Sequence, residues 1–226
     1  MKLIWQTAVL GLALVAFGCN SEGASNSAKN QDSTTEAGSM TQADAPAKAY
    51  EYLLNKEESS VDWMGNKPTG SHNGNISFSN GAMGFNGNMD LNHGVVEVDM
   101  TTITCIDIQD EEDNKDFVGH LKNEDFFDVT KYPTANLMVM SMTQKGSDGT
   151  FQIEGEIVIK GINRIVSFEA QRKMNGDQMI FDGILILDRT EFNVTYKSKS
   201  VFGDLGDKFI YDEFTLNFHL VFDPVR

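Results

Sequence analysis

The chain has 226 residues, which is enough for one well-packed domain and too few for two of ordinary size. Acidic residues outnumber basic ones by 33 to 18, and the formal net charge is −15 at pH 7. A charge of this sign repels phosphate backbones and anionic lipid headgroups, so we expect no nucleic acid among the partners.

The first 18 residues have the features of a secretory signal peptide. Lys2 precedes an apolar stretch, residues 3–17, that is shorter than the roughly 20 residues of a membrane span. Cys19 follows at the place where bacterial lipoproteins carry their lipidated first residue, although an ordinary signal peptidase would also accept residues 16–18. We therefore expect an exported cell-envelope lipoprotein that faces the periplasm or the cell surface, with a soluble periplasmic protein as the alternative.

A polar segment separates this start from the folded part of the chain. Residues 20–48 are mainly Ser, Asn, Ala, Gln and Thr, a composition that cannot bury a core and that is typical of a flexible tether. The expected organisation is a signal peptide at 1–18, an anchor and tether at 19–56, and a folded domain at 57–226. If Cys19 is acylated, Cys105 is the remaining thiol, and its neighbours Ile103 and Ile106 favour a small buried side chain over a nucleophile. The alternative is that Cys19 is removed or pairs with Cys105.

From about residue 57 onward, apolar residues recur at every second position, which is the period of a β-strand. The clearest run has Phe214, Leu216, Phe218, Leu220 and Phe222 on one face. In chain order we expect strands at 61–66, 75–79, 84–91, 95–104, 136–143, 151–159, 165–174, 179–187 and 214–222. Eight or nine long strands joined by short turns suit a closed antiparallel barrel at least as well as a sandwich. Gly155 and Gly183 interrupt inward rows, where a barrel bends or two backbones approach closely.

One segment, residues 110–127, lacks this alternation. Phe117, Val118 and Leu121 recur there at helical spacing behind Asp113, which we take as the N-cap. The pattern predicts one short helix beside the opening of the barrel.

Motifs for metal binding and catalysis are absent from the sequence. A calcium-binding loop starting at Asp110 would need Gly and Glu at its sixth and twelfth places, where Lys115 and Leu121 stand. None of the four histidines, His72, His93, His120 and His219, has the spacing of a metal-ligand motif. No sequence motif of a nucleophile or of a phosphate-binding loop occurs either. We therefore expect no metal site and no enzymatic activity.

Three consecutive blocks, residues 119–122 (GHLK), 125–129 (DFFDV) and 131–135 (KYPTA), closely resemble the central signature of the YceI-like family of bacterial envelope proteins. Further matches are Trp63 with residues 71–74, Gly155 with 159–161, and residues 187–192 with Tyr196, so the likeness extends over about 58–222. The resemblance implies a lipocalin-like antiparallel barrel of about eight strands, with a helical segment beside its opening, that encloses a long isoprenoid chain. Asn193 departs from the family, which usually has glycine there.

The resemblance and the alternation together define an expected ligand site. We expect the polar head of the ligand near His72, His120, Arg189 and Tyr196, with Arg189 pointing either inward, toward an anionic partner, or outward, toward Asp188 or Glu191. The apolar tunnel is expected to be lined by Phe117, Leu121, Phe126, Phe127, Met138, Met140, Phe151, Ile153, Ile157, Met179, Phe181, Leu185, Phe214, Leu216 and Phe218.

The function expected from this site is the binding, carriage or sequestration of a long-chain isoprenoid or a quinone-type amphiphilic lipid in the bacterial envelope. The expected partners are that lipid and, through the N-terminal anchor, a membrane; no cofactor is expected other than a bound isoprenoid or quinone. Two alternatives remain open: an enzyme that acts on an envelope lipid or a stress product through His72 and His120, and a structural protein with a dry core. The sequence does not decide whether the chain forms a homodimer.

Overall fold

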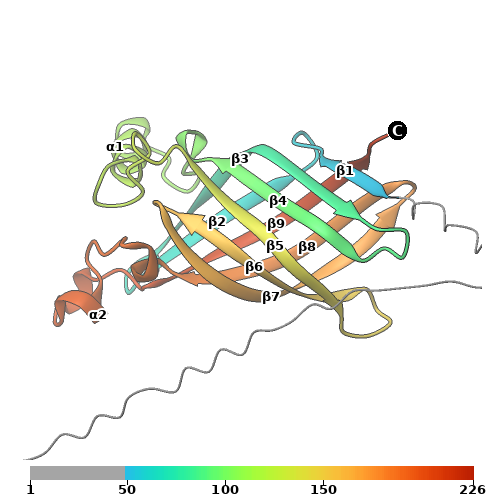
Figure 1. Ribbon diagram of the computed structural model, residues 1–226. Helices are drawn as coiled ribbons and strands as arrows, with labels where there is room; N and C mark the ends of the chain where they lie inside the picture. Colours follow the sequence, from blue (N-terminus) through green and yellow to red (C-terminus); the bar gives the residue numbers. More distant parts are fainter. Residues whose placement is uncertain (1–48) are drawn as a thin grey trace, which may run out of the picture. The chain divides into compact units, whose positions relative to one another are not determined.

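The computed structural model describes residues 49–226. Its strands form one antiparallel sheet in the order β1-β3-β2-β9-β8-β7-β6-β5-β4, and β3 also pairs with β4, so the sheet closes into a barrel (Figure 1). The expected lipocalin-like antiparallel barrel is thereby confirmed, with eight strands in the closed ring and one extra strand. The predicted signal peptide, Cys19 and the tether as far as residue 48 lie outside the described residues.

The strands are long and follow one another around the barrel. Their bounds are β1 Tyr50–Leu54, β2 Ser60–Lys67, β3 Gly70–Phe85, β4 Leu91–Asp99, β5 Thr134–Gln144, β6 Thr150–Ile159, β7 Ile162–Asn175, β8 Gln178–Asp188 and β9 Glu213–Pro224. The helical elements are η1 Met100–Thr102, α1 Glu111–Lys122, η2 Arg189–Phe192, α2 Lys199–Phe202 and η3 Gly206–Lys208. Among these residues no helix has both the length and the apolarity to span a membrane.

Strand β1 was missed by the sequence analysis, which placed residues 49–56 in the tether. It pairs with β3 and with the end of β9, while β2 pairs with the other ends of the same two strands. Tyr52 and Leu54 are buried in the core, so this short alternating run closes one end of the barrel. The folded domain therefore begins at least seven residues earlier than the predicted start, because β1 begins at Tyr50 rather than after residue 56.

Two predicted strands, 75–79 and 84–91, are wrong as separate elements. β3 runs without a break through the first of them, past a β-bulge between Phe78 and Asn80 that lies next to the Asn-Gly step, and ends at Phe85. Most of the second lies in the turn at residues 86–90, and β4 begins at Leu91. The predicted strand 95–104 ends early, because the Asp99 side chain accepts a hydrogen bond from the backbone N–H of Thr101 and starts η1.

Helix α1 lies at the end of the barrel where α2 also lies, opposite the end that carries the C-terminus (Figure 1). Its N-cap is Asp110 rather than the predicted Asp113, since the Asp110 carboxylate accepts hydrogen bonds from the backbone N–H groups of Glu112 and Asp113. Three acidic residues in the first turn and His120 and Lys122 in the last turn complement the helix dipole.

The interior of the barrel differs between its two ends. At the end closed by β1, the inward side chains are buried and pack against one another; they include Tyr52, Leu54, Met83, Phe85, Phe151, Ile153, Ala170, Met179, Phe181 and Phe222. At the end covered by α1, a second buried cluster joins Trp63, Ile103, Leu121, Phe126 and Val194. Space for a ligand is therefore to be sought at the α1 end.

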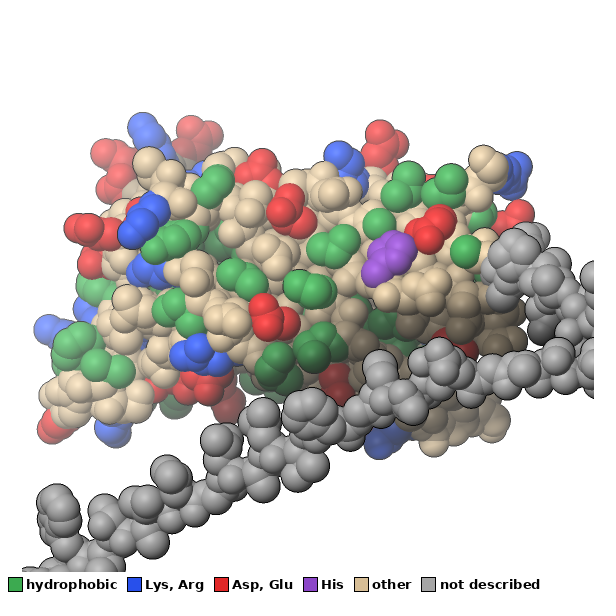
Figure 2. Space-filling model, in the orientation of Figure 1, with side chains coloured by type: hydrophobic (Ala, Val, Ile, Leu, Met, Phe, Trp, Pro, Cys, Tyr) green, Lys and Arg blue, Asp and Glu red, His purple; other side chains and the backbone are tan. Residues whose placement is uncertain are grey.

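Two side chains that were predicted to line the tunnel lie on the outer face of the barrel instead. Met138 and Met140 are 52% and 60% exposed, so their assignment to the tunnel was wrong. On β5 the inward positions are Ala135, Leu137 and Val139, so Met138 and Met140 face outward, and a β-bulge after Val139 then brings Met142 inward in place of Ser141. Figure 2 shows hydrophobic side chains such as these scattered among charged and polar ones on the outside of the barrel.

Candidate ligand-binding site

A cavity of about 390 Å³ occupies the end of the barrel that α1 covers. Its wall consists of residues of the six strands β2, β3, β4, β5, β6 and β9, and α1 with the turn after it supplies the cover through Phe117, Leu121, Phe126 and Phe127. The wall residues from the strands are mostly apolar: Ile76, Val96, Val98, Ala135, Leu137, Ile157, Ile159, Phe214 and Leu216. The dry-core alternative therefore fits only the opposite end of the barrel.

The structure brings about half of the predicted tunnel residues to this cavity. Those that line it are Phe117, Leu121, Phe126, Phe127, Ile157, Phe214 and Leu216. The remaining inward residues do not line it, because they lie at the filled end of the barrel or in the layer beneath the cavity: Phe151, Ile153, Met179, Phe181, Leu185 and Phe218. None of the three predicted tunnel methionines, Met138, Met140 and Met179, lines the cavity. Met100 is the one methionine of the described residues on its wall.

The cavity ends at a layer of side chains one step further along the strands. On β9, Phe214 and Leu216 line the cavity, and the next inward residue, Phe218, does not. The ring of Phe218 packs edge to face against Phe168 of β7, with the ring centroids 5.8 Å apart. Gly183 leaves the room for Phe218, because a Cβ at Gly183 would lie 2.5 Å from Phe218 Cζ. The expected close approach at Gly183 is thereby found. The pair of rings lies in the layer directly beneath the lining residues Phe214 and Leu216, and we call this layer the floor of the cavity.

Aromatic contacts fix the cover to the barrel at two places. The ring of Phe117 stacks on Trp63 of β2 at 6.4 Å and packs against His72 of β3 at 4.5 Å between centroids. At the other place His120 lies edge-on to Phe126 and to Tyr196, with centroids 4.9 and 4.6 Å apart. The helix is therefore tied to the strands by ring contacts that also form part of the cavity wall.

His72 and His120, two of the predicted head-group residues, both line the cavity, and each is oriented by a carboxylate. His72 Nδ1 lies 2.8 Å from Asp107 Oδ2, and His120 Nε2 lies 3.0 Å from Asp125 Oδ2. The remaining nitrogen of His72 lies 3.1 Å from Lys67 Nζ. Such pairs hold the rings in fixed orientations at the rim of the cavity.

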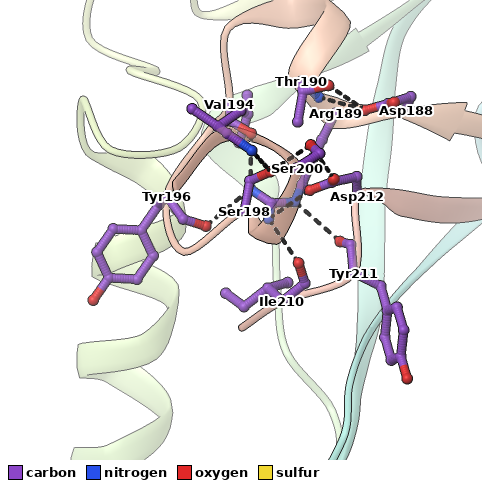
Figure 3. A network of polar contacts seen from close by, with 11 residues as sticks. Asp188, Arg189, Thr190, Val194, Tyr196, Ser198, Ser200, Ile210, Tyr211 and Asp212 are labelled. Carbon is purple, nitrogen blue, oxygen red and sulfur yellow. Dashed lines mark hydrogen bonds and ion pairs between the residues drawn. The ribbon is translucent and has the colours of Figure 1, made fainter. Parts of the chain in front are cut away.

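Arg189 also reaches the cavity wall, but its donors are already used (Figure 3). Its guanidinium donates to the carbonyl oxygens of Tyr211, Val194, Tyr196 and Ile210 at 2.7–3.1 Å and to Asp212 Oδ1 at 3.3 Å. These five bonds account for all five N–H groups of a guanidinium, so none remains for a ligand. The predicted partners Asp188 and Glu191 were wrong; Arg189 is 5% exposed and holds the loop around residues 194–212 against the barrel.

Asn193, where the family resemblance led us to expect glycine, adopts a left-handed conformation with φ 56° and ψ 34° and ends η2. Asparagine tolerates this conformation better than most residues, so the turn that glycine usually forms is kept. The next residues, Val194 and Tyr196, are thereby placed on the cavity wall.

Three lysines at the rim of the cavity were not predicted from the sequence. The charged residues that line the cavity are Lys67, Lys197, Lys208, Arg189 and Glu213, so cations prevail there in a chain of net charge −15. Lys67 is at the end of β2, and Lys197 and Lys208 are in the loop that Arg189 holds. Each lies in an irregular or terminal segment with no local pattern, and only the closure of the barrel brings them together.

A closed antiparallel barrel with a covered apolar cavity at one end places the protein in the lipocalin-like class. The model of the YceI-like domain matches residues 52–222, and the chain belongs to this family. A "UPF0312 protein" of Pseudomonas putida is 28% identical over 162 residues, which cover 66% of this chain and 78% of that protein.

Two solved bacterial proteins illustrate the similarity of fold. BcnA of Burkholderia cenocepacia superimposes with a TM-score of 0.54 at 21% identity, over 74% of this chain and 98% of its own. A polyisoprenoid binding domain of Saccharophagus degradans superimposes with a TM-score of 0.56 at 12% identity, over 77% of this chain and 98% of its own. At these identities the likeness shows the shared fold.

Proposed function

We propose that the protein binds an isoprenoid or quinone-type amphiphilic lipid in the cavity beneath α1 and carries or sequesters it in the bacterial envelope. The observation that carries the proposal is the apolar cavity of about 390 Å³, closed by the aromatic cover and edged by lysines. Its volume lies within the 300 to 1,000 Å³ that is usual for ligand pockets. The polyisoprenoid binding domain of S. degradans, which shares the fold, supports the same class of ligand.

The volume of the cavity sets the length of the tail that it can cover. An apolar cavity of about 150 Å³ takes up benzene, which corresponds to about 25 Å³ for each carbon atom. At that ratio the cavity of about 390 Å³ holds about 15 carbons, or three isoprene units. A longer chain would keep its remaining units outside this end of the barrel, because the ring pair of Phe168 and Phe218 closes the way to the filled end.

Burial of such a tail supplies the driving force. Removal of about 15 methylene-sized groups from water at about 0.8 kcal/mol each contributes about 12 kcal/mol. Association and the ordering of the tail oppose this by an amount of similar order, about 4 to 15 kcal/mol. Tight binding therefore depends on further contacts of the head group with the rim.

The rim determines the orientation of the ligand. With the tail toward the floor, the head lies among Lys67, Lys197 and Lys208 and beside the rings of His72, His120 and Tyr196. These groups donate hydrogen bonds or carry positive charge, which suits a head rich in oxygen atoms, such as a quinone or a phosphate. His72 and His120 are thus proposed to contact the head group rather than to transfer protons.

The proposed location follows from the start of the chain. A signal peptide at 1–18 and acylation of Cys19 would attach the barrel to a membrane through a polar tether of about 30 residues. Attachment to the membrane would keep the barrel near the bilayer, which is where an isoprenoid or quinone is found.

The test is extraction of the full chain, purified from its native membranes, followed by mass spectrometry of the organic phase. We expect an apolar molecule with an isoprenoid mass increment in about equimolar amount. In a second assay the protein without a ligand is titrated with farnesol, and the fluorescence of Trp63 in the cavity wall is followed. The variant Trp63→Phe should lose the signal and Met138→Gln, on the outer face, should keep it. Empty extracts together with no response to farnesol would refute the proposal.

A further inference from the structure

Three side chains that could hold a metal ion meet where the segment after η1 crosses β3. His72 is in β3, and Cys105 and Asp107 are in the connection that leads to α1. His72 Nδ1 lies 2.8 Å from Asp107 Oδ2, and Cys105 Sγ lies 3.2 Å from Asp107 Oδ1. The three atoms that could be ligands lie within 4.8 Å of one another.

We propose that His72, Cys105 and Asp107 form a binding site for a zinc-like divalent cation. Imidazole nitrogen, thiolate sulfur and carboxylate oxygen are the ligands that zinc takes in proteins, at about 2.0 to 2.3 Å from the ion. In a tetrahedral site such ligands are about 3.5 Å from one another. The present separations therefore need only small adjustments of side chains to admit the ion.

The backbone around the three residues holds them in place. The N–H of Asn73 donates to Asp107 Oδ1, and the N–H of Ile106 donates to the carbonyl oxygen of Asn73. From α1, the side-chain amide of Asn114 donates to the carbonyl oxygens of Cys105 and Ile108. The connection and β3 are thus fixed to each other before any ion binds, which lowers the cost of assembling the site.

Of the three groups, Asp107 is already charged, whereas Cys105 must lose its proton before it can bind a cation. Burial tends to raise the pKa of Asp107, but hydrogen bonds from Asn73, His72 and Cys105 lower it to about 2, so the carboxylate is charged. Burial raises the pKa of the Cys105 thiol. An incoming cation would displace the thiol proton into solvent as the sulfur–metal bond forms.

The positive charge of Lys67, next to His72, disfavours the binding of a cation at this site. Its ammonium lies 3.1 Å from His72 Nε2, so in the absence of metal Nε2 accepts a hydrogen bond and Nδ1 carries the proton toward Asp107. Coordination through Nδ1 moves the ring proton to Nε2, where it faces the ammonium. Replacement of Lys67 by methionine should therefore tighten metal binding, which is an effect that a purely structural cluster would not produce.

The proposed site is joined to the ligand cavity through His72, whose ring lines the cavity wall and packs against Phe117 of the cover. Three protein ligands leave one position of a tetrahedral ion for water or for an oxygen atom of another molecule. An ion held here would also tie the connection before α1 to β3. The binding of a cation by these three residues does not depend on which lipid the cavity takes.

The test uses the Cys19→Ser full chain, reduced and stripped of metal, so that Cys105 is the one thiol. Titration with Co²⁺ should give a thiolate-to-cobalt charge-transfer absorption that saturates at one ion per chain and disappears when Zn²⁺ is added. Cys105→Ser should abolish this absorption, and His72→Gln and Asp107→Asn should weaken Co²⁺ binding at least about tenfold. Lys67→Met should strengthen it.

The matched control is His120→Gln, since His120 and Asp125 form the same kind of pair without a thiol. This variant should bind Co²⁺ as the parent does. Near-UV circular dichroism reports whether each variant keeps its tertiary packing, and the conclusion rests on those variants that do. Absence of the charge-transfer absorption in the folded parent at millimolar Co²⁺, or its persistence in folded Cys105→Ser, would overturn the proposal.

Discussion

The ring of Phe218 occupies the space that a side chain at Gly183 would need. A Cβ on Gly183 would lie 2.5 Å from Phe218 Cζ and 3.0 Å from the carbonyl oxygen of Glu169. Since β8 and β9 are neighbours and Gly183 pairs with Phe218 in register, glycine on one strand lets the ring on the other lie across the interior. This relationship places the floor of the cavity at Phe218.

Replacement of Phe218 by alanine is therefore predicted to lengthen the cavity. Loss of the ring removes six carbons, about 150 Å³ at the ratio used above, which is room for about one more isoprene unit. We expect Phe218→Ala to bind geranylgeraniol about tenfold more tightly relative to farnesol than the parent does, in competition titrations that follow Trp63 fluorescence. The cost in stability should be about 3 kcal/mol.

Phe222→Ala is the matched control, because Phe222 is a fully buried ring of the same strand at the filled end of the barrel. It should lose stability as well and leave the preference for chain length unchanged. An unchanged preference in Phe218→Ala would mean that the tail does not reach the proposed floor.

Much of the barrel could be predicted from the sequence, since alternation along β6, β8 and β9 follows directly from one buried and one solvent-facing side. Met138 and Met140 show the limit of that argument, because apolar residues occupy both faces of β5 and alternation there does not tell which face is inward. The bulge after Val139 then brings Met142 inward in place of Ser141, and a bulge has no clear local signal. Alternation also identifies an inward side chain without telling whether it borders space or another side chain. The filled end with Met179 and Phe181 and the cavity end with Ile157 and Leu216 therefore look alike in sequence.

The polar part of the site was less predictable, for a different reason. His72 and Cys105 are far apart in the chain, and no spacing rule connects them, yet the strand pairing brings them together. The sequence left open whether Arg189 points inward or outward, because its main partners are backbone carbonyl oxygens of a loop, and such partners leave no trace in the side-chain sequence.

Arg189 is predicted to be essential for the loop that carries Val194, Tyr196 and Lys197. Arg189→Lys keeps the charge but cannot replace five hydrogen bonds in fixed directions, so buried carbonyl oxygens lose their donors. We expect a loss of about 3 kcal/mol or more in the free energy of unfolding, measured with urea. Asp212→Asn, which disturbs one of the five bonds, should cost about 1 kcal/mol. Equal effects of the two variants would contradict the assignment.

The lysines at the rim of the cavity should strengthen the binding of ligands with a negatively charged head group and have no effect on the binding of uncharged ones. We predict that the triple variant Lys67→Gln, Lys197→Gln and Lys208→Gln binds farnesyl phosphate about tenfold more weakly and binds farnesol as the parent does. Added salt should weaken farnesyl phosphate binding to the parent and have less effect on the variant. Lys56, Lys115 and Lys145, which do not line the cavity, provide a triple variant with the same change in net charge. A similar loss in that control would assign the effect to the overall field of the protein.

Asp182 provides a prediction for the dependence of stability on pH. The hydrogen bond from His219 lowers the pKa of Asp182, burial opposes this, and Lys173, 3.0 Å away, lowers it further. Because the folded state holds this carboxyl below its unfolded value of 3.8, the resulting stability is complete above that value and is lost as the pH falls through the folded pKa. Asp182→Asn should therefore be less stable than the parent in urea at about pH 5.5, and the difference should shrink toward about pH 2.5. Asp116→Asn, an exposed position on α1, should show a much smaller change over the same range. A difference for Asp182→Asn that stays constant from pH 5.5 to about 2.5 would show that the carboxyl is not stabilised in its charged form.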